Sequence, residues 1–224
     1  MGIRDTHAAL LFCAINYAFR NPQFQKFYFW AMGYRVGSPR RRKALLMHDE
    51  VLQFIAPKAL ALRFQHCVDL GGRNVNGNLR SLFSPVLSWT AVDQWPGDGV
   101  DIVADLRGWT PPREWDVVLC TEVLEHASGK KEILDTAAAC CTPTGVLLLS
   151  AACNPRPQHS AIDGLTLRDG EFYENVDPAW LEKELRERFH WVEVTTHPRG
   201  DIYVVATGPR RGIEDADLVD EEAA

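Results

Sequence analysis

The sequence lacks the features that mark several large classes of protein. Its six cysteines include no CxxC pair, which argues against a zinc site or a disulfide framework and favours free thiols in a reducing compartment. The longest apolar run near the N-terminus, residues 8–15, is too short to span a bilayer. Arg4 alone does not make a secretory signal. We therefore expect a cytoplasmic protein without a membrane span.

A surplus of basic charge is also missing, except near the N-terminus. Residues 1–45 carry eight lysines and arginines and one acid, whereas residues 46–224 carry sixteen basic and twenty-nine acidic residues. The larger region therefore has a net charge of −13, within a net charge of −6 for the whole chain. Such a region is a poor binder of nucleic acid, so we expect no nucleic-acid partner.

Composition divides the chain into three regions. Residues 1–45 form an aromatic and basic extension, broken at Pro22 and at residues 37–39, in which we expect two short helices. It is either a cap over the core, an arm whose basic residues 40–43 meet an anionic group, or a loosely attached stretch if Met47 is the natural start. Residues 46–208 form the main domain, and residues 209–224 form an acidic tail that we expect to be disordered.

The main domain alternates apolar runs with amphipathic segments, as in a parallel sheet covered by helices. The last two predicted strands are separated by a connection short enough for a hairpin, so we expect an antiparallel strand at the edge of the sheet. Helices are predicted near residues 47–60, 75–83, 128–141 and 178–189, and strands at a run ending at Asp69 and at residues 87–93, 100–105, 115–120, 145–151, 191–196 and 201–208.

The turn after the first strand excludes common nucleotide sites. The chain has no GK[ST] sequence, so it has no P-loop. Residues 71–77 read GGRNVNG, which does not satisfy the GxGxxG spacing that brings backbone close to a pyrophosphate. A dinucleotide cofactor is therefore disfavoured.

Three acids follow predicted strands and surround this turn. Asp69 precedes the glycines, Asp93 ends the next strand, and Asp105 ends the one after it. A carboxylate at the second strand end suits the two hydroxyls of a ribose, and Asp105 suits an adenine amino group. Taken alone, Asp93 or Asp105 would be better explained as the cap of a turn or helix. Together they predict a pocket for an adenosine without phosphates.

The order of five segments resembles the class I S-adenosylmethionine-dependent methyltransferases, including the type 11 and type 12 methyltransferases. The segments are CVDLGGRNVNG, TAVDQW, DIVADL, WDVVLCTEVLEH and GVLLLSA, and the resemblance covers about residues 47–207. It implies an α/β, Rossmann-like, seven-stranded and mostly parallel sheet with helices on both faces and one antiparallel edge strand.

The same resemblance implies S-adenosylmethionine as the cofactor. Gly71 would lie against it, Asp93 would hold the ribose hydroxyls, and Asp105 with Leu106 would frame the adenine. The cofactor-binding residues implied are Asp69, Gly71, Gly72, Arg73, Asp93, Gln94, Asp105, Leu106 and Thr121.

Arg73 departs from the family pattern, which has a glycine at this place in the turn. S-adenosylmethionine carries no phosphate but has a free carboxylate. We expect Arg73 either to pair with that carboxylate or to point to solvent. Asn74 and Asn76 tolerate the unusual backbone angles of such a turn.

The end of the fourth strand, followed by CTEVLEHASG, is expected to lie beside the transferred methyl group. Thr121 and Glu122 would be nearest, with Glu122 a candidate catalytic residue. The set Glu122, Glu125, His126 and His159 is similar to the metal-binding quartet of the small-RNA 2′-O-methyltransferases. However, EVLEH is also common in methyltransferases without a metal, and the rest of the RNA-methylating signature is absent. We therefore expect no bound divalent metal.

The long polar segment of residues 153–176, here called the acceptor loop, is the best candidate for contact with the methyl acceptor. His159 is the candidate general base, since histidine titrates near neutrality, but a surface histidine bonded within its own loop is an equal alternative. Tyr173 is expected to pack the loop.

The sequence therefore predicts methyl transfer to a hydroxyl of a small molecule or glycan. N-methylation and a protein acceptor remain open. DNA N-methylation is disfavoured because the fourth strand is not followed by a [DNS]PP[YFW] motif. The alternatives are a metal-assisted RNA 2′-O-methyltransferase and a catalytically silent binding module of the same fold.

Overall fold

The computed structural model describes residues 66–75 and 88–211, together with Val51, Phe54, Ile55, Lys58, Leu79 and Arg80. The predicted N-terminal extension, residues 1–45, lies outside these residues, as do positions 212–224 of the predicted tail. The helix predicted near 47–60 is described at four positions, all helical. The chain divides into two units, residues 1–64 with 76–85 and residues 65–75 with 86–224. The sheet belongs to the second unit.

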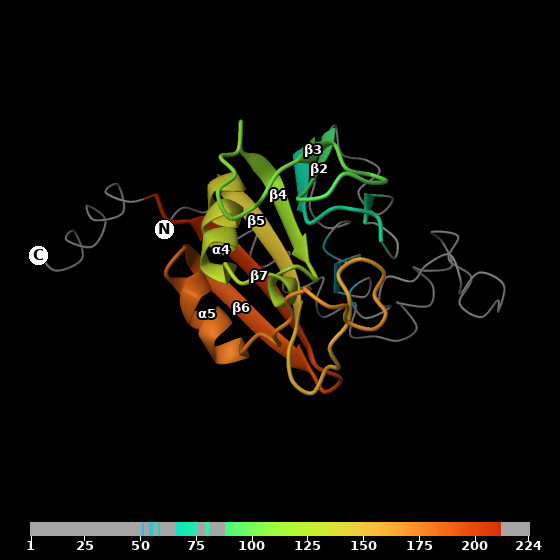
Figure 1. Ribbon diagram of the computed structural model, residues 1–224. Helices are drawn as coiled ribbons and strands as arrows, with labels where there is room; N and C mark the ends of the chain where they lie inside the picture. Colours follow the sequence, from blue (N-terminus) through green and yellow to red (C-terminus); the bar gives the residue numbers. More distant parts are fainter. Residues whose placement is uncertain are drawn as a thin grey trace, which may run out of the picture. The chain divides into compact units, whose positions relative to one another are not determined.

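Seven strands form one sheet (Figure 1). In space they run in the order β3-β2-β1-β4-β5-β7-β6, and β7 is antiparallel to both of its neighbours while all other pairs are parallel. The predicted seven-stranded, mostly parallel sheet with a single antiparallel strand is confirmed. That strand lies between β5 and the outermost strand β6. The strands are β1 (His66–Leu70), β2 (Ser88–Asp93), β3 (Ile102–Val103), β4 (Trp115–Thr121), β5 (Cys141–Ala152), β6 (Phe189–His197) and β7 (Asp201–Pro209).

The central strands are buried on both faces because their residues are almost all apolar. Every residue from Val117 to Cys120 in β4 and from Leu147 to Leu149 in β5 is fully buried. Such continuous apolar runs stabilise a sheet that is covered on both sides. Strand β3 is shorter than the predicted residues 100–105, and Asp101, just before it, accepts a hydrogen bond from the Ala91 N–H at 2.8 Å.

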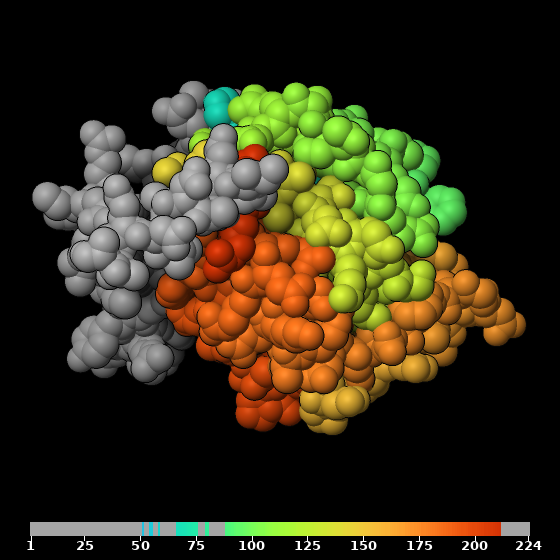
Figure 2. Space-filling view, turned by 90° about the vertical axis from the view of Figure 1, so that its left-hand side faces the viewer, coloured from blue at the N-terminus to red at the C-terminus, as the bar shows by residue number. Residues whose placement is uncertain are grey.

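Helices α4 (Lys130–Cys140) and α5 (Pro178–Arg186) cover the same face of the sheet (Figures 1 and 2). An ion pair joins the two helices, since Nζ of Lys131 in α4 lies 2.8 Å from Oε1 of Glu184 in α5. A second joins α4 to the turn after α5, where Nε of Arg188 lies 2.7 Å from Oδ1 of Asp135. Asp177 caps the start of α5 by accepting from the Ala179 N–H at 3.0 Å. The helix predicted near 75–83 lies mostly outside the described residues. Among the residues described, no helix is both long and apolar enough to cross a bilayer.

The order of strands places β1 between β2 and β4, so the chain leaves β1 on one side and returns on the other. In open α/β sheets, ligands bind beyond the carboxyl ends of the strands at this reversal. The segments there follow Leu70, Asp93, Thr121 and Ala152. The fold therefore directs attention to these four strand ends.

Replacing Leu148 by alanine should lower the free energy of unfolding by about 2–5 kcal/mol, because the side chain is fully buried in β5 and its loss leaves a cavity. Urea unfolding followed by circular dichroism measures the change. Leu165, which is 70% exposed, is the matched control, and its alanine variant should stay within about 0.5 kcal/mol of wild type. Equal losses in both variants would contradict the assigned core.

Candidate functional site

The turn after β1 requires glycine at two consecutive positions. Gly71 has a φ of +80°, and a Cβ atom there would lie 2.3 Å from Cγ2 of Val123. A Cβ atom on Gly72 would lie 2.8 Å from that of Ala91. Both backbone N–H groups donate to the Val92 carbonyl, at 2.8 and 3.1 Å. The turn therefore packs tightly between the ends of β2 and β4, where only glycine fits, and its contact with a cofactor stays a prediction.

The residues that follow the turn are attached to the loop after β2. The Asn74 side chain donates to the Asp98 carboxylate at 2.6 Å, and its N–H donates to the Asp98 carbonyl at 2.9 Å. Asp93, at the end of β2, accepts from the Trp95 N–H at 2.9 Å, which orients its carboxylate. Gln94 and Trp95 are exposed. The predicted ribose-binding acid thus stands beside the glycine turn.

Arg73 lies across this region and does not point to solvent. Its side chain is only 19% exposed, and its Nε lies 3.9 Å from Oδ1 of Asp93. Its Nη2 donates to the Ala161 carbonyl, in the acceptor loop, at 3.0 Å. The solvent-facing alternative for Arg73 is therefore wrong, because the side chain lies near Asp93 at the end of β2 and hydrogen-bonds to Ala161 in the acceptor loop.

Asp69 is buried behind the turn, 5% exposed, with its Cγ only 3.0 Å from where a Cβ on Gly72 would lie. Burial raises the pKa of this carboxyl to about 7, and the negative charge of Asp93 adds to the rise. A carboxyl without water around it holds its proton more tightly. Near neutral pH Asp69 therefore lies close to the midpoint of its titration.

The two residues predicted to frame adenine have structural partners. Asp105 is exposed and accepts from Nε and the N–H of Arg107, at 2.9 and 3.0 Å, and these hydrogen bonds lower its pKa. The Leu106 side chain packs in the core, while its carbonyl accepts from Oγ1 of Thr136 at 2.7 Å. Contact of either residue with adenine stays a prediction.

Glu122, the candidate catalytic acid after β4, is bound into a buried network. Its backbone is left-handed, with a φ of +57°, a conformation that is rare outside glycine and is often found at functional sites. Its carboxylate accepts from Oγ of Ser150 at 2.9 Å and lies 2.7 Å from Nη2 of Arg156, whose Nη1 is 2.5 Å from Asp201. The carboxylate of Glu122 is therefore paired with Arg156, whose guanidinium it shares with Asp201.

The short helix η2 (Leu124–His126) carries a buried acid beside a half-buried histidine. Glu125 is fully buried, and no described residue hydrogen-bonds to either of its carboxylate oxygens. Burial, and then the charge of Glu122, raise its pKa well above the usual value. Burial, and then the proximity of His159, lower the pKa of His126 to about 4, so its imidazole is neutral at pH 7.

The acceptor loop brings His159 to this helix. The ring centroids of His159 and His126 are 4.9 Å apart, and Tyr173 lies 5.0 Å from His159 and 5.2 Å from His126, all in edge-to-face contacts. We call these three residues the aromatic cluster. The structure therefore unites His126 and His159, which are 33 positions apart in the sequence. Tyr173 packs within the loop, as predicted. Nδ1 of His159 also lies 3.3 Å from the Pro157 carbonyl, so the structure fits the alternative of a histidine bonded within its own loop as well.

The donor atoms of Glu125, His126 and His159 all lie within 4.8 Å of one another, close enough to bind one metal ion. Glu122, the fourth member of the quartet considered from sequence, is held by Arg156 and Ser150 instead. Three of the four residues thus come together.

The acceptor loop contains no helix or strand but is braced by its own polar groups. Ser160 donates to Oε1 of Glu171 at 2.9 Å and accepts from the Ile162 N–H at 3.0 Å. The Arg168 N–H donates to Oε2 of Glu171 at 2.8 Å, and its guanidinium pairs with Asp163. Ala161 and His159 are therefore parts of one ordered segment.

A family model described as a methyltransferase domain matches residues 40–197 of the chain. The chain belongs to this methyltransferase family. With the strand order of the sheet, the match confirms the resemblance to class I S-adenosylmethionine-dependent methyltransferases. No curated protein matches the chain in sequence.

Solved structures of methyltransferases share the fold. DhpI, in complex with SAH, is 21% identical, with 76% of this chain and 94% of that one covered and a TM-score of 0.53. The N-methyltransferase NodS from Bradyrhizobium japonicum WM9, with S-adenosyl-L-homocysteine (SAH), is 11% identical, with 81% and 98% covered and a TM-score of 0.55. An O-methyltransferase family protein from Burkholderia thailandensis is 16% identical, with 83% and 71% covered and a TM-score of 0.50.

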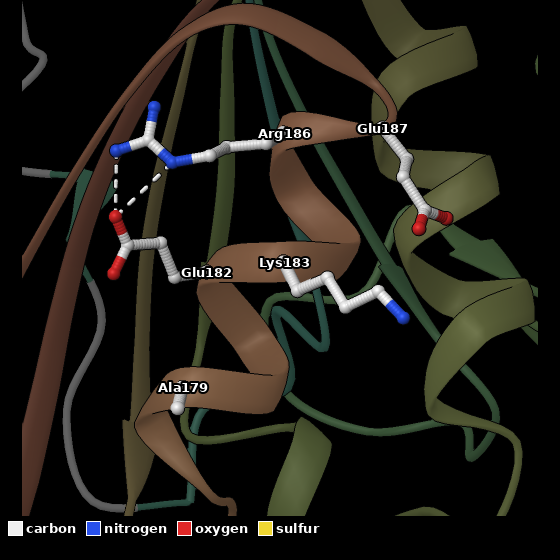
Figure 3. Close-up of a pocket in the computed structure, with 5 residues that line it drawn as sticks. All are labelled: Ala179, Glu182, Lys183, Arg186 and Glu187. Carbon is white, nitrogen blue, oxygen red and sulfur yellow. Dashed lines mark hydrogen bonds and ion pairs between the residues drawn. The ribbon is translucent and has the colours of Figure 1, made fainter.

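A separate hollow of this methyltransferase is lined by α5 and the residue that follows it. Figure 3 shows its lining, in which the side chains of Glu182 and Arg186 form an ion pair, 2.6 Å in length. The remaining lining residues are Ala179, Lys183 and Glu187. No predicted site residue lines this hollow. The site is therefore placed at the strand ends, where the predicted residues lie.

Sequence reasoning missed the buried polar partners of the methyltransferase site. Arg156 and Ser150 contact Glu122, and Asp201 contacts Arg156, yet these three partners lie in three different segments. The only signal was an arginine next to prolines in NPRPQH, which does not reveal its partners.

The Asp69→Asn substitution should make stability less dependent on pH. Because folding raises the pKa of Asp69 from 3.8 to about 7, the folded state binds more protons between these values, and wild-type stability is lost as the pH rises through that range. The free energy of unfolding of wild type should therefore fall relative to the variant between about pH 4 and pH 7, by an amount on the order of 4 kcal/mol. Urea unfolding at a series of pH values tests this, and a difference independent of pH would contradict it.

Proposed function

We propose that this methyltransferase transfers a methyl group from S-adenosylmethionine to a hydroxyl group of a small molecule or glycan. His159 is proposed to accept the hydroxyl proton. The observation that carries the proposal is the contact of His159 with His126, which brings an imidazole of the acceptor loop to the carboxyl end of β4. This is where an open α/β sheet places its ligand.

In the proposed reaction, the oxygen of the acceptor attacks the methyl carbon as the bond from carbon to sulfur breaks. The sulfonium becomes a neutral thioether, the oxygen becomes a methyl ether, and the hydroxyl proton passes to His159. Since the sulfonium already activates the methyl group, alignment of the two reactants supplies most of the acceleration. A base then removes the proton that a hydroxyl acceptor carries.

The turn of Gly71 and Gly72 is proposed to bring the backbone close to the cofactor, and Asp93 is proposed to accept hydrogen bonds from its ribose. A carboxylate has acceptor oxygens only, so it suits two hydroxyl donors. The SAH bound in the DhpI and NodS structures supports this choice of cofactor. The five described cysteines are buried and unpaired, which supports the proposed cytoplasmic location.

A metal-assisted reaction, including transfer to an RNA 2′-hydroxyl, is the second candidate. It is favoured by the grouping of Glu125, His126 and His159 and by the buried Glu125 carboxylate without hydrogen-bond partners among the described residues. Oxygen and imidazole donors fit a divalent ion. Such an ion would lower the pKa of a hydroxyl bound to it. The net charge of −13 on residues 46–224 favours a small acceptor over RNA, because RNA is itself negatively charged.

Calorimetric titration with S-adenosylhomocysteine should show binding to wild type and at least a tenfold weaker affinity for Asp93→Ala, a loss of about 1.4 kcal/mol. The loss follows from removing the proposed ribose acceptors. Asp135→Ala, on the exposed side of α4, is the control and should bind like wild type. Absence of binding to wild type, or equal affinity for Asp93→Ala, would refute the cofactor site.

His159→Gln should lower the rate of methyl transfer by roughly 10²–10⁴-fold while affinity for S-adenosylhomocysteine is kept, because only the base is removed. The assay follows labelled methyl groups from S-adenosylmethionine into the small-molecule and RNA fractions of a cell extract. His190→Gln, on β6, is the control with the same change.

The same assay with chelator separates the two candidates. Activity that chelator leaves unchanged supports His159 as base. Activity that chelator abolishes and that manganese, magnesium or cobalt restores supports the metal-assisted reaction. Cofactor binding without methyl transfer to either fraction would support a silent binding module.

A further inference from the structure

Arg73 occupies a place where the turn of this family has a glycine, and it joins two parts of the proposed site. Its guanidinium lies between the end of β2, at Asp93, and the acceptor loop, at Ala161. The chain makes room for its stem at Gly97, where a Cβ atom would lie 2.9 Å from Cδ and 3.0 Å from Cγ of Arg73. The position of this side chain is therefore set by packing as well as by charge.

The hydrogen bonding of Arg73 is incomplete. Nη2 donates to the Ala161 carbonyl, but Nε is buried and has no hydrogen-bond partner within the described part of the chain. The 3.9 Å between Nε and Oδ1 of Asp93 is too long for a hydrogen bond. A buried N–H normally has an acceptor, so Nε of Arg73 is a donor that a bound ligand can use.

A ribose hydroxyl can hydrogen-bond to Asp93 and to Nε of Arg73. Asp93 only accepts hydrogen bonds and Arg73 only donates them, whereas a hydroxyl does both. A hydroxyl held by Asp93 can therefore accept from Nε of Arg73 at the same time. This step rests on the proposed function, since it assigns the ribose of the cofactor to Asp93.

The other end of Arg73 reaches the segment that carries His159. The Ala161 carbonyl lies two residues beyond His159, next to Ser160, whose N–H donates to the Leu165 carbonyl at 2.9 Å and whose hydroxyl donates to Glu171. A shift of Ala161 therefore moves the hydrogen-bonded part of the acceptor loop that includes Ser160, Leu165 and Glu171, and not a single residue. A ligand that fixes the guanidinium of Arg73 therefore also fixes the part of the acceptor loop beside the aromatic cluster.

We propose that Arg73 is a positioning residue that couples the ribose of the bound cofactor to the acceptor loop. With the cofactor in place, Nε binds the ribose hydroxyl while Nη2 holds Ala161, so the acceptor loop is held in the arrangement that places His159 against His126. The coupling is reciprocal, because a more ordered loop also holds Arg73 ready for the cofactor. Acceptor binding is thereby favoured after cofactor binding.

Hydrogen–deuterium exchange of residues 157–172, with and without saturating S-adenosylhomocysteine, tests the coupling in the full chain. In wild type the ligand should slow exchange of these amides by about tenfold or more. In Arg73→Ala the ligand should still bind, more weakly, but should leave the exchange of the loop unchanged. The KM for the acceptor should rise more than kcat falls, since the base itself is untouched.

A second variant addresses the same contact without removing charge. Gly97→Ala places a methyl group against the stem of Arg73 and should also abolish the ligand-dependent protection. Gly108→Ala is the matched control, because nothing lies within 4 Å of its added Cβ, and it should behave like wild type. Full protection in both Arg73→Ala and Gly97→Ala would overturn the coupling alone. Failure of wild type to bind S-adenosylhomocysteine would overturn the proposed function together with it.

Discussion

The arrangement of the site depends on one buried guanidinium. Arg156 holds Glu122 at the end of β4 and Asp201 at the start of β7, and it belongs to the acceptor loop itself. Its backbone fits only because residue 200 is glycine, with a φ of +97° and a would-be Cβ 2.5 Å from the Arg156 nitrogen. Removing the guanidinium would leave two carboxylates without a counter-charge, one of the costliest changes inside a protein.

This network separates the residues of the EVLEH segment into two groups with different surroundings. Glu122 forms an ion pair with Arg156, while Glu125 and His126 lie beside His159 of the acceptor loop. The neutral imidazole of His126, with a pKa of about 4, cannot act as an acid at neutral pH. The proposed function assigns proton transfer to His159 or, in the metal-assisted alternative, to a group bound by Glu125, His126 and His159.

The parts of the molecule that the sequence predicted are those governed by local patterns. The apolar runs of β4 and β5 and the Gly71–Gly72 turn are readable because hydrophobic period and glycine position determine them. The partners of Arg73 and Arg156 were not readable, since Ala161 is 88 positions from Arg73 and Asp201 is 45 from Arg156. Arginine side chains are long, and only the folded chain shows which carbonyl or carboxylate each one reaches.

The braced acceptor loop has a consequence for recognition. A loop that is ordered only when substrate arrives must lose conformational entropy at that moment, which weakens binding to every acceptor alike. Here the hydrogen bonds of Ser160 and Glu171 within the loop reduce that loss, and the proposed contact of Arg73 with the cofactor reduces it before the acceptor binds. Discrimination among acceptors can then depend on how well a molecule fits a preformed wall, so a small substrate with few contacts can still be selected by shape.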